Sequence, residues 1–103
     1  RKPKPGQIAL SAVGSAVEAM ARAIAPEIAP KRINVVSPGI IDTPMVGLVG
    51  DARVEHYNNV TKTHILDRAG HSTEVAQAII FAIENDFITG TTIDVDGGWL
   101  AAQ

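Results

Sequence analysis

The segment Val35-Val36-Ser37-Pro38-Gly39-Ile40-Ile41-Asp42-Thr43-Pro44 decides the fold class of this chain. Its apolar, β-branched start predicts a buried parallel strand, and the Pro-Gly pair turns the backbone out of that strand. In open α/β sheets, ligands bind at the carboxyl ends of the strands. We therefore expect a ligand site where this strand ends.

The segments on either side predict helices and one further strand. The first helix covers residues 8–25 and kinks or ends near Pro26, and the first strand covers 32–36. A helix over about 51–63, capped by Asp51, follows. The last helix, capped by His71 or Ser72, runs to about residue 85, and the second strand covers 91–95. This order predicts two parallel strands joined by one right-handed crossover. The first strand is apolar on both faces, so we expect something to cover its free edge.

Composition narrows the functional classes. The chain has 103 residues, which suits a single domain over residues 1–103 and a core that buries roughly 65% of the unfolded surface. Nine basic and eleven acidic residues give a net charge of −2, without the basic stripe that nucleic-acid binding needs. Absence of cysteine excludes a disulfide framework. No apolar run approaches the ~20 residues of a membrane span, so we expect a cytoplasmic protein without membrane contact.

Four groups of residues occur in the order and spacing of one known family. They are Pro5-Gly6-Gln7 with the helical residues 16–27, the strand and turn over residues 32–39, Arg68-Ala69-Gly70 with Glu74-Val75-Ala76, and Ile88-Thr89-Gly90 with the residues through Gly98. Together they resemble the C-terminal part of a short-chain dehydrogenase/reductase over nearly all of the chain except residues 46–64. The resemblance implies an α/β fold, the C-terminal part of a Rossmann-like doubly wound parallel sheet, with about two parallel strands and three to four helices here.

The same resemblance implies hydride transfer between NAD or NADP and an alcohol or carbonyl compound. Pro38 and Gly39 would line the nicotinamide pocket, while the Ile41 backbone and the Thr43 hydroxyl would hold the carboxamide. A carboxamide needs a donor and an acceptor at fixed spacing, which a chain leaving a strand provides. Thr43 can also cap a helix that begins at Pro44, and the Pro-Gly pair can be a plain turn. Residues 44–66 would form a substrate lid.

The catalytic positions depart from the family pattern. The family carries Tyr and, four residues later, Lys on the helix that corresponds to residues 8–25, where the ammonium lowers the pKa of the phenol. Those positions are Leu10 and Gly14 here, and neither side chain can transfer a proton. The single tyrosine, Tyr57, lies in the lid segment. We expect the family's catalytic Ser and glycine-rich phosphate turn before Arg1, so no catalytic residue is assigned in this chain.

Several polar residues have simpler explanations than chemistry. The three histidines, His56, His64 and His71, lie in different segments and predict no metal site. Asp94 and Asp96 suit an edge strand and a turn rather than an acid–base pair. Arg68 is expected to form a surface ion pair with Asp67 or Glu74, worth under ~1 kcal/mol.

Two functional hypotheses follow from these features. The first is the C-terminal portion of a short-chain oxidoreductase that is not catalytically competent alone and acts on an unidentified small molecule. The second is a degenerate, non-catalytic relative that serves nucleotide binding or oligomer assembly; a third option is a parent protein that uses other proton donors. A homo-oligomer is expected, because family members pair through the helix over 8–25 and because Ala12, Ala16, Ala19 and Ala23 form a small-residue face there.

Overall fold

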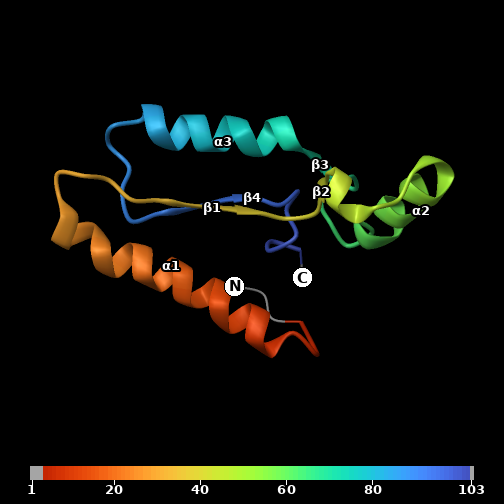
Figure 1. Ribbon diagram of the computed structural model, residues 1–103, viewed down its shortest axis with the longest axis horizontal. Coiled ribbons are helices and arrows are strands. Elements are labelled where there is room, and N and C mark those ends of the chain that lie inside the picture. The colour runs from red at the N-terminus through yellow and green to blue at the C-terminus, as the bar shows by residue number, and fades with distance from the viewer. Residues whose placement is uncertain (1–3, 103) are drawn as a thin grey trace.

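The computed structural model describes residues 4–102 as helices on the two faces of a short parallel sheet (Figure 1). The elements are α1 (Ile8–Ile28), β1 (Val35–Pro38), β2 (Ile41–Asp42), the 3₁₀ helix η1 (Pro44–Val46), α2 (Gly50–Val60), β3 (Gly70–His71), α3 (Ser72–Glu84) and β4 (Thr92–Val95). The predicted α/β class and the parallel pairing of its two main strands are confirmed.

The main sheet consists of β1 and β4, paired in parallel from Val35 opposite Thr92 to Pro38 opposite Val95. Helix α1 lies on one face of this sheet and α3 on the other, while α2 lies beyond the carboxyl end of β1 (Figure 1). Helices on both faces explain why β1 is apolar on both sides. The layers leave the carboxyl ends of the strands facing α2 and the C-terminal turn.

Strand β1 begins later and ends later than the sequence pattern predicts, at Val35 and Pro38 instead of residues 32 and 36. The ladder tolerates Pro38 because the backbone amides of Val35 and Gly39 face β4, donating to Thr91 and Val95 at 2.9 Å. The alternate residue Pro38 therefore directs its nitrogen to the open edge, where a missing donor costs nothing. The Pro38-Gly39 pair ends β1, but the Gly39 amide still donates the last hydrogen bond of the ladder to Val95.

The start of β1 is held to α3 by side chains that were expected to belong to the strand. The Arg32 guanidinium donates to the carbonyl oxygens of Ala82 at 2.8 Å and Ile83 at 2.7 Å, near the C-terminus of α3. A cation is favourable there, because the last carbonyls of a helix lack partners and carry partial negative charge. The Asn34 side chain donates to Ile88 and accepts from the Thr91 amide.

A second, very short parallel ladder joins β2 to β3, and the sequence pattern did not predict it. It brings Ile41 opposite Gly70 and closes the segment that holds η1 and α2. The expected cap of α2 is wrong, because Val49 occupies the N-cap position and Asp51 lies inside the first turn. The alternative that His71 caps α3 is confirmed.

The chain exposes far more surface than a globular protein of its mass. Its accessible surface is 7278 Å², whereas a folded monomer of this size exposes about 5,500 Å². The radius of gyration is 15.5 Å, against about 13 Å for a compact domain of this length. Among the described residues, Ala21 is the only buried apolar residue, at 4% exposure. The expected modest core is therefore absent from this part of the chain.

Helix α1 also corrects the expectation that no apolar run approaches the length of a membrane span. Its 21 residues, Ile8–Ile28, are long and apolar enough to cross a membrane by length and composition. That test is weak evidence, since the core helix of a soluble protein passes it too. Helix α1 lies along one face of the sheet (Figure 1), and 6% of its most apolar 18-residue stretch is buried.

Candidate functional site

The carboxyl end of β1 packs directly against the end of β4. A Cβ atom at Gly39 would lie 2.8 Å from the Asp96 Cα, which is closer than real Cβ contacts allow. The Asp96 carboxylate accepts hydrogen bonds from the amides of Gly98 at 2.9 Å and Leu100 at 3.0 Å. Gly39 is thus required by the approach of two strands, and Asp96 organises the following turn as expected.

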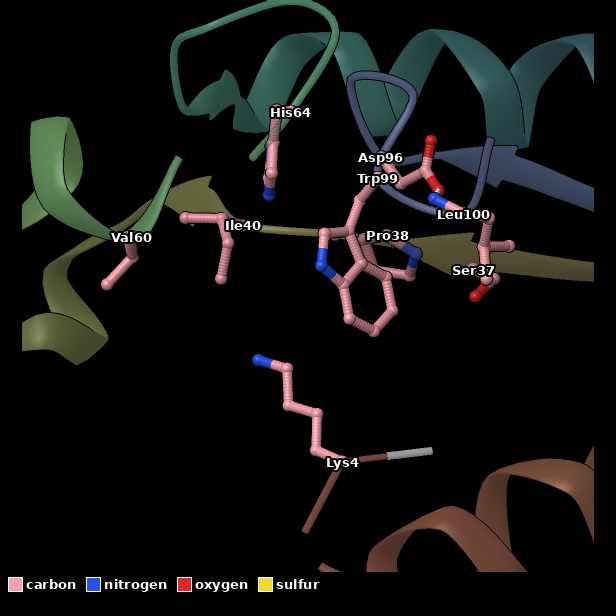
Figure 2. Close-up of a pocket in the computed structure, with 10 residues that line it drawn as sticks. Lys4, Ser37, Pro38, Ile40, Val60, His64, Asp96, Trp99 and Leu100 are labelled. Atoms are coloured by element: carbon pink, nitrogen blue, oxygen red, sulfur yellow. Dashed lines mark hydrogen bonds between the residues drawn. The ribbon is translucent and has the colours of Figure 1, made fainter. Parts of the chain in front are cut away.

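Pro38 and Gly39 line a cavity of about 230 Å³ at this strand end. The remaining walls come from segments far apart in sequence: Lys4 before α1, His64 after α2, and Trp99 after β4 (Figure 2). The Lys4 ammonium lies 5.2 Å from the centre of the Trp99 ring, within the range of a cation–π contact. Sequence reasoning missed Lys4, His64 and Trp99; the only signal was a lone tryptophan directly after Gly97-Gly98.

Ile41 and Thr43 lie one step further along the chain, on β2 and just after it. The Tyr57 hydroxyl accepts from the Thr43 amide and donates to the Ile41 carbonyl oxygen, both at 3.4 Å. Thr43 occupies the N-cap position of η1, yet its side chain makes no capping hydrogen bond. The structure therefore gives no support to capping by the Thr43 hydroxyl, and it places Tyr57 of the lid segment beside the expected carboxamide-binding backbone.

Arg53, one helical turn before Tyr57, braces the same loop. Its guanidinium forms an ion pair with the Asp42 carboxylate and donates to the carbonyl oxygens of Leu48 at 3.1 Å and Thr43 at 3.4 Å. It also lies 5.8 Å from the centre of the Tyr57 ring. Spacing of four residues puts Arg53 and Tyr57 on one face of α2, which is the signal that could have identified them.

Leu10 and Gly14, the positions expected to correspond to the Tyr and Lys of the resembled family, face this end of the sheet. Leu10 and Gly14 both line a groove of about 480 Å³ between α1 and β1, together with Lys4 and Trp99. A Cβ atom at Gly14 would meet nothing within 4 Å. The groove therefore has room for a longer side chain at residue 14, and its present lining offers no phenol.

A salt bridge borders the neighbouring cavity of about 290 Å³, which shares Ile40, His64 and Asp96 with the first. The Arg68 guanidinium donates to both carboxylate oxygens of Glu74, at 2.7 and 3.0 Å. These bonds and the His71 amide, at 2.7 Å, lower the pKa of Glu74 from 4.5 to about 2. Glu74 is the partner of Arg68 in the expected surface ion pair, and it also closes the first turn of α3.

The histidines serve separate purposes. His56 contacts the Tyr57 ring edge-on at 5.2 Å, His64 lines both cavities, and His71 begins α3. Over residues 4–102, no group of three or more metal-ligating side chains is gathered in one place.

A parallel α/β sheet with two cavities at the carboxyl ends of its strands is typical of Rossmann-like folds. Comparison with known proteins gives the family. Residues 2–100 match the family described as enoyl-(acyl carrier protein) reductase. Carbonyl reductase family member 4 of Danio rerio is 40% identical over 100 residues, covering 94% of this chain and 39% of that protein. Human 3-oxoacyl-[acyl-carrier-protein] reductase is 39% identical over 99 residues, with coverage of 94% and 39%.

A solved structure of a small-chain dehydrogenase in complex with NADPH superimposes with a TM-score of 0.86 and 36% identity, covering 98% of this chain and 47% of that chain. The chain belongs to the short-chain dehydrogenase/reductase family of oxidoreductases. It spans about 39% of the length of the curated relatives named here.

Proposed function

We propose that this chain forms the C-terminal part of an NAD(P)-dependent oxidoreductase and supplies the nicotinamide side of its cofactor site. The supporting observation is the cavity at the carboxyl end of β1, lined by Pro38 and Gly39. In this proposal the Ile41 backbone and the Thr43 hydroxyl hold the carboxamide, because they offer the donor and acceptor that it needs. The bound cofactor would supply the hydride, while residues 44–66 close over the substrate and exclude water.

The chain is not catalytically competent alone in this proposal. Its share of the relatives' length, together with Leu10 and Gly14 at the proton-transfer positions, supports this view. Either NAD or NADP is compatible with these residues, and a cytoplasmic location belongs to the same proposal.

Calorimetry with NAD, NADH and NADPH tests the proposal. The 103-residue chain alone should bind no dinucleotide more tightly than ~1 mM. The intact polypeptide, meaning the longer oxidoreductase of which the chain forms the C-terminal part in this proposal, should bind one. Thr43→Val should weaken that binding up to tenfold by removing one hydrogen bond, at about 1.4 kcal/mol per factor of ten. Thr63→Val, on an exposed residue, is the matched control. Equal effects of the two substitutions, or steady NADH turnover by the chain alone, would overturn the proposal.

A second candidate function is a non-catalytic relative that retains nucleotide binding or serves assembly. The observation that favours it is the groove of Leu10 and Gly14, which has neither a phenol nor an ammonium on α1. Family enzymes without their Tyr would bind the cofactor and transfer no hydride. Cofactor binding without turnover by the intact polypeptide would select this function.

A homo-oligomer is proposed on the surface of α1 and α3. Both helices expose large apolar side chains, among them Val13, Met20, Ile80 and Ile83, and Ala12, Ala16, Ala19 and Ala23 are exposed as well. Exposed apolar area of this kind favours association. Light scattering at micromolar concentration should give a dimer or larger species, and a clean monomer would contradict the proposal.

A further inference from the structure

The segment that would hold the carboxamide begins with a two-residue strand that has one free edge. In the β2–β3 ladder Ile41 lies opposite Gly70, and the Gly70 amide donates to the Ile40 carbonyl oxygen at 2.9 Å. The backbone groups of successive strand residues point to opposite edges, so the amide and the carbonyl of Ile41 point away from β3. Because an isolated pair of strands is marginal by itself, this edge needs a second support.

The Tyr57 hydroxyl of α2 lies on that free edge. It donates to the Ile41 carbonyl oxygen and accepts from the Thr43 amide, both at 3.4 Å. It thereby bridges the two residues to which the proposed function assigns the carboxamide. Both distances are long for hydrogen bonds, so the hydroxyl does not fix the segment alone.

Arg53, one helical turn earlier on α2, binds the residue between them. Its guanidinium forms an ion pair with the Asp42 carboxylate. It also donates to the carbonyl oxygens of Thr43 at 3.4 Å and Leu48 at 3.1 Å. A guanidinium offers several donors in a rigid planar arrangement, so one side chain can hold several acceptors at fixed positions. Arg53 and Tyr57 together attach residues 41–43 to one face of α2.

These contacts come from outside the cofactor cavity. Arg53 and Tyr57 line a separate cavity of about 250 Å³, and this cavity shares no lining residue with the Pro38–Gly39 cavity. The Thr43 hydroxyl makes no capping bond to η1, and a carbonyl oxygen such as that of Ile41 can accept two hydrogen bonds. Both groups therefore stay available to a carboxamide while α2 holds the segment.

We infer that Arg53 and Tyr57 are positioning residues of the nicotinamide site. Helix α2, which the proposed function places in the substrate lid, also sets the spacing between the Ile41 backbone and the Thr43 hydroxyl. A donor and an acceptor hold a planar amide only at the correct spacing. The inference rests on the proposed function, because it concerns one end of the same dinucleotide. Loss of either side chain weakens the hold on the nicotinamide end and leaves the adenosine end unaffected.

Calorimetry on the intact polypeptide tests this difference between the two ends. NADPH is compared with 2′-phospho-ADP-ribose, and NADH with ADP-ribose, because each fragment lacks only the nicotinamide. Tyr57→Phe should weaken binding of the dinucleotide about fivefold, the net effect of one hydrogen bond, and leave the fragment's affinity unchanged. Arg53→Lys should act in the same direction. The ratio of the two affinities is the readout, since a general loss of folding would lower both.

Two controls and a double variant complete the experiment. Thr63→Val and Arg22→Lys make comparable changes at exposed residues and should leave the affinity ratio unchanged. Tyr57→Phe and Thr43→Val act on the same contact, so their effects on dinucleotide binding should combine to less than their product. This coupling decides the outcome where a fragment binds too weakly to be measured, and Tyr57→Phe decides it if Arg53→Lys unfolds.

The failure of this inference differs from the failure of the proposed function. If the unmodified polypeptide binds no dinucleotide, the proposed function is refuted and the inference with it. If Thr43→Val lowers dinucleotide affinity but Tyr57→Phe does not, or lowers dinucleotide and fragment affinities equally, the inference alone is refuted. Tighter dinucleotide binding by Tyr57→Phe would also refute it, because the hydroxyl would then compete with the carboxamide. Independent effects of Tyr57→Phe and Thr43→Val would do the same.

Discussion

Gly39 and Asp96 approach so closely that a single methyl group on Gly39 would lie 2.8 Å from the Asp96 Cα. This contact joins the carboxyl ends of β1 and β4, and the Pro38–Gly39 cavity opens beside it. The separation of these two strand ends therefore controls the shape of the candidate site.

Gly39→Ala should destabilise the protein by about 1–3 kcal/mol, because the added methyl group must push backbone rather than a flexible side chain. Denaturant unfolding measures the loss. Gly14→Ala is the matched control: its Cβ atom meets nothing within 4 Å, and replacing a helical glycine should stabilise by about 0.5–1 kcal/mol. If Gly39→Ala and Gly14→Ala shifted the unfolding free energy in the same direction, the role assigned to Gly39 would be contradicted.

Arg53 and Tyr57 should hold the 41–48 loop against α2. Tyr57→Phe removes the hydroxyl that bonds Ile41 and Thr43, at a cost of about 1 kcal/mol. Arg53→Lys keeps the charge but loses the planar fork that reaches Asp42, Leu48 and Thr43. Amide hydrogen exchange at Thr43 should accelerate about fivefold in either variant, since RT is about 0.6 kcal/mol. The control Arg22→Lys, on an exposed residue of α1, should leave the exchange rate unchanged. An unaltered rate in both Tyr57→Phe and Arg53→Lys would show that these side chains do not hold the 41–48 loop.

The lowered pKa of Glu74 predicts a stability contribution confined to one pH window. Its carboxylate is stabilised in the folded state, so the contribution is complete above the ordinary pKa of 4.5 and disappears as pH falls towards about 2. The unfolding free energies of the protein and of the Glu74→Gln variant should therefore approach each other as the pH falls from 4.5 towards about 2. Glu84→Gln, which removes the same charge from the other end of α3, is the control for a general effect of net charge on the unfolding free energy.

The size of the Glu74 effect should fall with added salt. Arg68 and Glu74 side chains are 52% and 34% exposed, so solvent and ions screen the pair. If the unfolding free energies of the protein and of Glu74→Gln still differed by the same amount in 1 M salt, or at pH 2, the ion pair assigned to Arg68 and Glu74 would be contradicted.

Leu10 and Gly14 offer a gain-of-function test. Leu10→Tyr with Gly14→Lys should restore a phenol and an ammonium four residues apart on the groove-facing side of α1. General acid–base catalysis contributes about 10²–10⁴-fold, so carbonyl reduction by the intact polypeptide with NADPH should rise at least a hundredfold. Leu10→Phe with Gly14→Lys supplies the ring without the hydroxyl and should give no increase. Equal rates from the two double variants would show that the phenol is not the missing group.

The sequence alone determined the fold class, the parallel strand pair and the family. These follow from local signals: β-branched runs, helical periodicity, and the Pro-Gly and Gly-Gly pairs that end the two strands. Pro38, Gly39, Ile41 and Thr43 were named by the family resemblance and not by a local signal. The local signal indicated only that a ligand site lies where the first strand ends. Boundaries were less accurate, since Pro38 continues β1 only because its nitrogen faces the open edge.

Only the tertiary structure brought together residues that are distant along the chain. Lys4, His64 and Trp99 come from three separate loops, and no spacing rule relates them. The same holds for Tyr57 against Ile41 and for Arg32 against the end of α3, both of which depend on how helices dock. The exposure of the helices, too, emerged only from packing. An amphipathic pattern predicts that one face of a helix is buried, yet in the described part of the chain Ala21 is the only residue of α1 that is buried.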